Sequence, residues 1–183
     1  MLISAERSSL LLIDIQERLL PAMAGAQELE RRCSILLEAA KRLDVPIAVS
    51  EQYPKGLGAT VAPLREHFGN APVFAKTEFS GWRNEALRTH LIALHEAGRP
   101  QVVAAGIEAH VCVLQTAIDL AQAGFSVFAV ADAIASRAPA SVALAQERMR
   151  RAGIAIVNTE MVVFELLGRA GTGEFRELSR LIK

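Results

Sequence analysis

Six short apolar segments, separated by longer amphipathic stretches, most limit how this sequence can fold. Their residues do not alternate between apolar and polar, so they are typical of parallel strands covered on both faces. Alternation with helix-sized stretches predicts repeated right-handed βαβ units and a three-layer α/β/α fold. The segments are Leu10–Ile13, Pro46–Ser50, Val73–Ala75, Gln101–Ala105, Val127–Ala131 and Ile154–Val157.

Helical patterns fill the intervals, and in Gln27–Leu43 the apolar residues recur along one stripe. Glycines at positions 98, 124 and 153 follow predicted helices, where left-handed stop residues are favoured. The irregular stretch Glu51–Pro63 follows the second strand and is expected to form a pocket wall. Glu174–Lys183 is expected to be a short amphipathic helix that caps the core or pairs with another subunit. The other predicted helices are Asn84–Ala97, Val111–Ala123 and Pro139–Ala152.

Composition favours one globular domain spanning residues 1–183, because 51% of the residues are hydrophobic and 22% are charged. Twenty basic and twenty acidic residues give zero net charge, which argues against nucleic acid and anionic membranes as partners. Apolar runs stay far below the roughly 18 residues of a membrane helix, and a signal peptide is not apparent. Two cysteines make no disulfide framework, so a reducing cytoplasm is the expected location.

Common nucleotide and hydrolase motifs are missing from the sequence. The first strand runs into Asp-Ile-Gln-Glu-Arg rather than a glycine-rich phosphate loop, and neither a P-loop nor a G-x-S-x-G elbow occurs. The four histidines lack metal-binding spacing, so we expect no metal and no cofactor. They are His67, His90, His95 and His110.

Three residues capable of chemistry lie at the carboxyl ends of predicted strands, where open α/β sheets place their ligands. Asp14 ends the first strand, Lys76 ends the third, and Cys112 opens the helix after the fourth. A helix start and a nearby ammonium lower a thiol pKa, so Cys112 is expected to be activated, with Asp14 as its proton acceptor. Taken singly, these residues also suit a helix cap, a solvated lysine and a core cysteine. Cys33 lies mid-helix on an apolar stripe and is expected to be buried and inert.

Three spaced motifs resemble one known family over nearly the whole chain. They are LLLIDIQERL around Asp14, FAKTEFSGW around Lys76 and VVAAGIEAHVCVLQTA around Cys112. Together they resemble the isochorismatase-like cysteine hydrolases, which include nicotinamidases and N-carbamoylsarcosine amidases. The segments SEQYPKGLGAT and TEMVVFELLG are most similar to the isochorismatase domain-containing proteins within that family.

The resemblance implies a Rossmann-like six-stranded parallel sheet in the order 3-2-1-4-5-6, with Asp14 and the Cys112 loop flanking its switch point. It also implies a catalytic triad of Asp14, Lys76 and Cys112, and a cis peptide at Ile107–Glu108. The backbone N–H groups of Glu108 and Cys112 are then expected to form an oxyanion hole. A dimer or larger homo-oligomer is the further expectation.

Two departures from the family bear on the substrate. Nicotinamidases carry metal-binding histidines where this chain has Ser50-Glu-Gln-Tyr-Pro-Lys-Gly, which argues against both a metal and nicotinamide. Isochorismatases cleave a vinyl ether without a nucleophilic cysteine, so the presence of Cys112 favours amide or related acyl chemistry.

We therefore expect a metal-independent cysteine hydrolase that acts on a small, uncharged or weakly charged amide through a thioester. Two alternatives stay open: ether cleavage by Asp14 and Lys76 with Cys112 a bystander, and a non-hydrolytic protein with a redox-sensing thiol or an interaction surface. Asp132 and Arg137 are expected to fix a loop. Residues expected either to contact substrate or to pack locally are Gln16, Tyr53, Phe79, Trp82 and His110.

Overall fold

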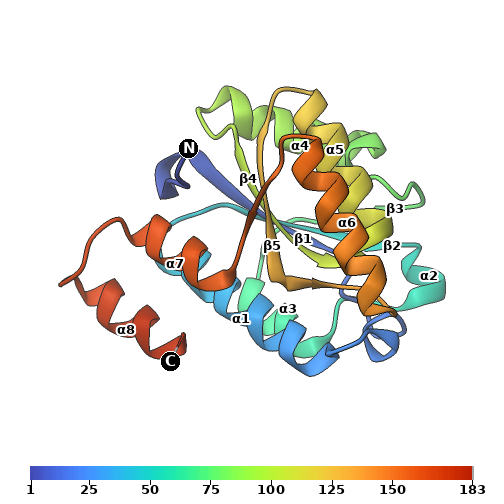
Figure 1. Ribbon diagram of the computed structural model, residues 1–183, viewed down its shortest axis with the longest axis horizontal. Coiled ribbons are helices and arrows are strands. Elements are labelled where there is room, and N and C mark those ends of the chain that lie inside the picture. The colour runs from blue at the N-terminus through green and yellow to red at the C-terminus, as the bar shows by residue number, and fades with distance from the viewer. Residues whose placement is uncertain (183) are drawn as a thin grey trace.

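A six-stranded parallel sheet lies between two layers of helices in the computed structural model, which describes residues 1–182 (Figure 1). The strand order is β3-β2-β1-β4-β5-β6, and every neighbouring pair is parallel. The three-layer fold and the strand order are thereby confirmed. The strands are β1 (Ser8–Ile13), β2 (Ile47–Gln52), β3 (Val73–Lys76), β4 (Gln101–Ile107), β5 (Ser126–Ala135) and β6 (Ala155–Val157).

Helices α4, α5 and α6 cover one face of the sheet, and α1, α3 and α7 cover the other (Figure 1). Within residues 1–182, no helix is both long and apolar enough to cross a membrane. The α-helices are α1 (Ala26–Arg42), α2 (Pro54–Leu57), α3 (Ala62–Phe68), α4 (Glu85–Glu96), α5 (Leu114–Gln122), α6 (Pro139–Arg151), α7 (Thr159–Leu167) and α8 (Gly173–Leu181). Short 3-10 turns span Ala5–Arg7, Leu20–Ala22 and Gly81–Arg83, and a π-helical turn spans Ala109–Val113.

Strand β1 explains why the apolar runs do not alternate. Leu10 and Leu12 pack toward α1, whereas Leu11 and Ile13 pack toward α4 and α5, so all of β1 is buried. Each such side chain contributes about 1.5–3 kcal/mol of burial free energy. The edge strand β3 is covered less completely, and its Val73 is exposed.

The helix expected over Val111–Ala123 differs from the observed structure. A π-helical turn over Ala109–Val113 precedes α5, so Cys112 lies in that turn rather than in the first turn of an α-helix. Such turns occur frequently at functional sites. The stretch Glu51–Pro63 is also more regular than expected, because it contains α2 and the start of α3.

The C-terminal helix α8 packs against two other helices of the chain. Leu178 of α8 is buried against Ile35 and Ala39 of α1 and Val163 of α7. Within this chain α8 therefore packs against α1 and α7 in a small cluster separate from the two main ones, and its pairing with another subunit stays a prediction. Lys183, the end of the segment expected to be helical, lies outside the described residues.

Gly106 is required where β4 passes the end of β1. Its φ is +129°, and a Cβ atom there would lie 2.0 Å from the carbonyl oxygen of Ile13. Ile13 is the register partner of Gly106 and directly precedes Asp14. The close approach of the two backbones therefore brings the end of β1 next to the segment that leads to Cys112.

Candidate active site

The ends of β1 and β3 bring two predicted site residues into direct contact. Asp14 directly follows β1, Lys76 ends β3, and Lys76 Nζ lies 2.7 Å from Asp14 Oδ2. Both side chains are completely buried. The charges of both residues act on the thiol of Cys112, which is 6% exposed. The structure thus brings Asp14, Lys76 and Cys112 together at the switch point of the sheet.

Asp14 is held by its backbone and by both carboxylate oxygens. Its φ of 56° lies in the left-handed region, which aspartate tolerates better than most residues. Ser50 Oγ donates to Asp14 Oδ1 at 2.7 Å, while Lys76 takes Oδ2. The Asp14 backbone N–H donates to the carbonyl of Ser50 at 3.0 Å. The carboxylate therefore has one fixed orientation.

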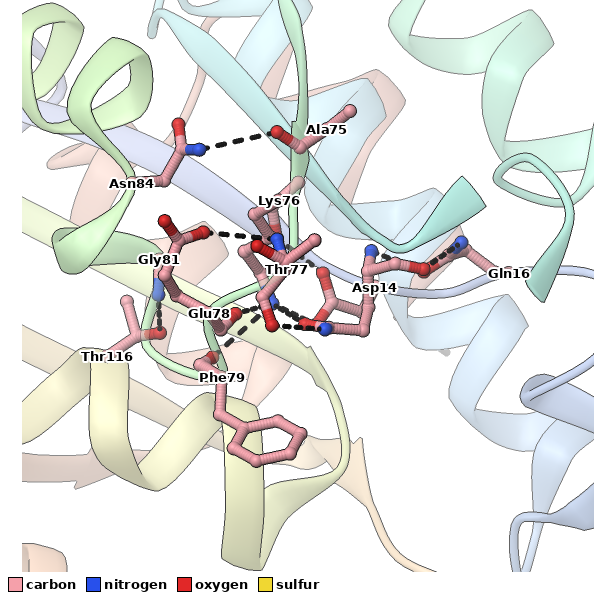
Figure 2. Close-up of polar contacts among 12 residues, drawn as sticks. Asp14, Gln16, Ala75, Lys76, Thr77, Glu78, Phe79, Gly81, Asn84 and Thr116 are labelled. Atoms are coloured by element: carbon pink, nitrogen blue, oxygen red, sulfur yellow. Dashed lines mark hydrogen bonds and ion pairs between the residues drawn. The ribbon is translucent and has the colours of Figure 1, made fainter. Parts of the chain in front are cut away.

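The ammonium of Lys76 meets four acceptors, although it carries three N–H groups (Figure 2). Besides Asp14, Nζ donates to Gln52 Oε1 at 2.6 Å and contacts the carbonyl oxygens of Glu78 at 3.2 Å and Phe79 at 3.3 Å. Protein groups therefore take every donor of the ammonium. Lys76 can act on neighbouring groups through its charge, but it has no N–H left for a substrate anion.

The thiol of Cys112 departs from the activated state expected from its sequence position. Burial, together with the Asp14 carboxylate, raises the pKa of Cys112 to about 12, although the charge of Lys76 acts in the opposite direction. The expectation of a depressed pKa is wrong, because burial and the Asp14 carboxylate outweigh the effect of the Lys76 charge. Cys112 is therefore a neutral thiol near pH 7, and its proton must leave as the sulfur attacks.

Cys33 is buried as expected. It is fully inaccessible, burial raises its pKa, and its Sγ lies 3.8 Å from the carbonyl oxygen of Ala133. Its place on the apolar stripe of α1 makes it a core residue.

The segment before Cys112 contains a cis peptide bond between Ile107 and Glu108. The carbonyl of Glu108 accepts hydrogen bonds from the backbone N–H groups of Val111 and Val113. Its carboxylate pairs with Arg137, with Nε 3.0 Å from Oε2, so Arg137 fixes this loop. The oxyanion hole at the N–H groups of Glu108 and Cys112 stays a prediction.

Gln16 is fully buried, and its amide is committed to backbone groups. Nε2 donates to the carbonyls of Gln52 at 3.0 Å and Gly58 at 2.7 Å, and Oε1 accepts from the N–H of Gln52 at 2.7 Å. Both N–H groups of the amide are therefore used, and neither is left to bind a substrate. Gln16 therefore connects two strand ends rather than contacting a ligand.

The aromatic candidates lie in different surroundings. Tyr53 is exposed and borders a cavity of about 350 Å³ that also reaches Lys76. The exposed ring of Phe79 points away from the Asp14–Lys76 pair (Figure 2). Trp82 is partly buried and packs edge-on against Phe125, with ring centroids 5.5 Å apart, at the margin of the core that includes α4 and α5. Among these three, Tyr53 is the one whose cavity also includes a triad residue, Lys76, whereas Asp14 and Cys112 do not line that cavity.

His110 and Asp132 each bind a neighbouring segment. His110 Nδ1 lies 2.9 Å from Ser136 Oγ, which connects the π-helical turn to the residue after β5. Asp132 Oδ1 accepts from the backbone N–H and the hydroxyl of Thr159, where α7 begins. Asp132 therefore fixes a segment start, as expected of it.

Three polar residues of the site were missed by sequence reasoning. Ser50 and Gln52 bind Asp14 and Lys76, and Thr116 Oγ1 accepts from the N–H of Gly81 at 2.8 Å. Two polar residues spaced by two at the end of an apolar strand lie on one face, and this signal could have revealed Ser50 and Gln52. Thr116 offers no comparable signal, since its partner lies in another loop.

Among residues 1–182, no group of three or more His, Cys, Asp or Glu side chains is arranged to hold a metal ion. A larger cavity of about 620 Å³ lies between α1 and α8 and is lined by residues outside the triad, among them Ile35 and Leu178. Most of its lining consists of arginines, glutamates and apolar side chains of these two helices, with Ser34 of α1 and His67 of α3, and it includes none of Asp14, Lys76 and Cys112.

Sequence comparison links residues 8–161 to the isochorismatase domain. Isochorismatase domain-containing protein 1 of Salmo salar is 40% identical over 171 residues, which cover 93% of this chain and 59% of the relative. The chain therefore spans less than two thirds of that relative's length.

Two solved structures share the fold over nearly the whole chain. The MAR1 ribonuclease of Caenorhabditis elegans is 36% identical, with a TM-score of 0.92, and covers 100% of this chain and 92% of its own. YcaC of Pseudomonas aeruginosa, solved with hexane-2,5-diol and covalent acrylamide, is 25% identical with a TM-score of 0.89. The likeness covers 99% of this chain and 95% of YcaC.

Proposed function

The chain belongs to the isochorismatase family, and from this premise we propose that it is a metal-independent cysteine hydrolase with Asp14, Lys76 and Cys112 as its catalytic triad. The observation that carries the proposal is the buried Asp14–Lys76 ion pair beside the thiol of Cys112. A proton acceptor beside a sulfur nucleophile is the arrangement that acyl transfer through a thioester uses, and here a cation holds the acceptor.

The first half of the reaction starts from a neutral thiol, since burial raises the pKa of Cys112 to about 12. The thiol proton passes to Asp14 as Sγ bonds to the substrate carbonyl carbon, and the carbonyl π electrons move to oxygen. The N–H groups of Glu108 and Cys112 stabilise that oxyanion. As the oxyanion collapses, the carbon–nitrogen bond breaks, and the nitrogen takes the proton from Asp14. A thioester and a free amine or ammonia result.

The second half returns the enzyme to its starting state. Asp14 takes a proton from water as the water oxygen bonds to the thioester carbon. The carbon–sulfur bond then breaks, Sγ takes the proton back from Asp14, and the carboxylic acid leaves. Lys76 keeps Asp14 in place in both halves, since it contacts Oδ2 at 2.7 Å and does not itself donate the transferred proton.

A small uncharged carbonyl compound is the proposed substrate class. Protein acceptors take all the donors of Lys76, so a substrate carboxylate or phosphate gains no hydrogen bond from it. The covalent acrylamide in the similar YcaC supports the idea that small neutral electrophiles can react within this fold. We infer no cofactor for this reaction.

Ether cleavage by Asp14 and Lys76 is the first alternative. It requires Asp14 to give a proton to an ether oxygen, yet the carboxylate accepts from both the Lys76 ammonium and the Ser50 hydroxyl. The thiol mechanism starts with this carboxylate as a proton acceptor, so it suits the observed contacts better.

Ribonuclease activity is a second alternative, because the similar Caenorhabditis elegans protein carries that name. Phosphodiester cleavage benefits from cations that can bind the phosphate, whereas here the lysine of the site is paired and the chain has zero net charge. We therefore propose that nucleic acid is not a partner. A homo-oligomer and a cytoplasmic location complete the proposal.

The decisive experiment uses intact mass after rapid acid quench. The protein is incubated with primary amides, carbamoyl compounds, isochorismate and a short RNA. A substrate of the proposed class leaves a transient acyl adduct on Cys112 that disappears as ammonia accumulates, and Cys112→Ala forms none. Turnover of isochorismate or RNA that survives Cys112→Ala would contradict the proposal. A panel without turnover, combined with peroxide oxidation of Cys112, would favour a redox-sensing thiol instead.

A further inference from the structure

The amide of Gln52 lies between the triad lysine and the loop that follows it. Gln52 Oε1 accepts from Lys76 Nζ at 2.6 Å, and Gln52 Nε2 donates to the carbonyl of Thr77 at 2.8 Å. Lysine can only donate and a carbonyl can only accept, so these two partners fix which end of the amide faces the ammonium. The side chain is thus held in one orientation.

The backbone of Gln52 is held as firmly as its side chain. Gln16 accepts from the N–H of Gln52 at 2.7 Å and donates to its carbonyl at 3.0 Å. Gln16 follows β1, Gln52 ends β2 and Lys76 ends β3, and these strands are neighbours in the sheet. A chain of amides therefore connects three strand ends and delivers one oxygen to the ammonium.

We propose that Gln52 is a positioning residue of the site: it holds Lys76 Nζ against Asp14 and satisfies one N–H of the ammonium without adding charge. This inference rests on the proposed function. It also explains why the acceptor is an amide. A carboxylate at this place would leave two anions and one cation beside the thiol, whereas the amide leaves the full positive charge to Asp14 and Cys112.

The neutrality of Gln52 matters because the sulfur becomes negative when it reacts. The Lys76 charge favours the thiolate of Cys112, while Asp14 and burial oppose it. The other charged or titratable groups close to this site include Tyr53, Lys55 and Glu78, which border the same cavity as Lys76, and also Glu108 with its partner Arg137, and His110. These residues are the same in every variant at position 52, so a difference in thiol ionisation between a charged and an uncharged variant reports the charge added there.

The test uses Gln52→Glu, which keeps the size of the side chain and adds a negative charge. Alkylation of Cys112 by iodoacetamide is followed from pH 7 to pH 10 by peptide mass mapping. We expect the rate profile of Gln52→Glu to shift to higher pH, with alkylation about tenfold slower at pH 8.5. The conservative Gln52→Asn, which adds no charge, is expected to keep the pH profile of the parent protein.

Gln122→Glu is the matched control, since Gln122 is exposed at the far end of α5, the helix that follows Cys112. It adds the same charge away from Lys76 and is expected to stay within twofold of the parent. A profile of Gln52→Glu that matches Gln122→Glu would overturn the inference. If Gln52→Glu shows no cooperative thermal unfolding, Gln52→Leu replaces it, and an unchanged alkylation rate in that variant would overturn the inference too.

Lys76→Met separates failure of this inference from failure of the proposed function. If Lys76→Met slows alkylation of Cys112 but Gln52→Glu does not, only the positioning role of Gln52 is refuted. If Lys76→Met also leaves the profile unchanged, the lysine has no influence on the thiol, and the proposed triad fails with it.

Discussion

Lys76 Nζ lies 2.7 Å from Asp14 Oδ2, and this ion pair is completely buried. Two charges removed from water in this way depend on each other, because each supplies the solvation that the other has lost. The pair is therefore a structural element as well as a proposed catalytic one, and changes to either residue affect both stability and chemistry.

The first prediction concerns the stability of this pair. Lys76→Met leaves Asp14 buried without its cation and is expected to lower the free energy of unfolding by about 3–5 kcal/mol. The double variant Lys76→Met/Asp14→Asn removes both charges and is expected to recover part of that loss. Urea denaturation of the parent, the two single variants and the double variant measures the coupling. Additive losses would show that the pair does not act as a unit.

The second prediction concerns the pH dependence of Cys112. Burial raises its pKa from an ordinary value near 9 to about 12, so the thiolate fraction is small at neutral pH. Alkylation by iodoacetamide is expected to rise about tenfold per pH unit between pH 7 and pH 9. Peptide mass mapping measures the alkylation of Cys112 and, as an internal control, that of the fully buried Cys33. A rate that levels off below pH 8 would mean that the thiol is activated after all.

The same shift has a consequence for stability. A thiol that stays protonated in the folded state but ionises when unfolded favours folding below pH 9 and loses that contribution as pH rises toward 12. Cys112→Ala removes this effect, so the parent is expected to lose more stability than the variant between pH 9 and pH 12. Parallel loss in both proteins would contradict the raised pKa.

The third prediction concerns Gly106. A methyl group there would lie 2.0 Å from the carbonyl oxygen of Ile13, at a φ of +129°, so Gly106→Ala must displace a backbone next to Asp14. We expect a loss of about 3 kcal/mol or more, or failure to fold. Gly124→Ala is the matched control, because its φ is also positive but its Cβ would meet no atom within 4 Å. That variant is expected to lose about 1 kcal/mol, and equal losses would show that the contact with Ile13 is unimportant.

Much of this architecture could be predicted from local pattern. The short apolar runs indicate strands because a strand buried on both faces has no polar side, as Leu10 and Leu11 illustrate by packing into opposite layers. Asp14 and Lys76 were found because each follows directly on such a run. The order of the strands came from family resemblance, since periodicity says nothing about which strands are neighbours.

The remaining features depend on contacts between distant segments. The pKa of Cys112 is set by burial under other elements, and a position near a helix start does not report that burial. Trp82 lies next to a site loop in sequence, but its ring packs against Phe125. The side chain of Gln16 is of a type that often binds ligands, yet its amide is hydrogen-bonded to backbone groups of the second strand and the loop that follows it.

The fourth prediction concerns metals. The stretch Glu51–Pro63 contains no histidine. Chelation is therefore expected to change neither the activity nor the unfolding temperature. The measurement is thermal unfolding and turnover before and after EDTA dialysis, with metal content determined by plasma emission spectroscopy. One equivalent of tightly bound zinc or iron in the purified protein would contradict it.

The last prediction concerns the charge of the molecules that reach Cys112. Asp14, Gln52 and two carbonyls take the donors of Lys76, so an anion approaching the thiol meets the Asp14 carboxylate without a free N–H to bind. Iodoacetamide and iodoacetate carry the same leaving group and differ mainly in charge. We expect Cys112 to react at least tenfold faster with the neutral reagent, beyond the ratio measured for free cysteine. Asp14→Asn removes the repelling carboxylate and is expected to bring the ratio back toward that of free cysteine, whereas Gln122→Glu is expected to leave it unchanged. A preference for iodoacetate in the parent protein would show that a cation is available in the site, and the substrate class would then have to include carboxylates.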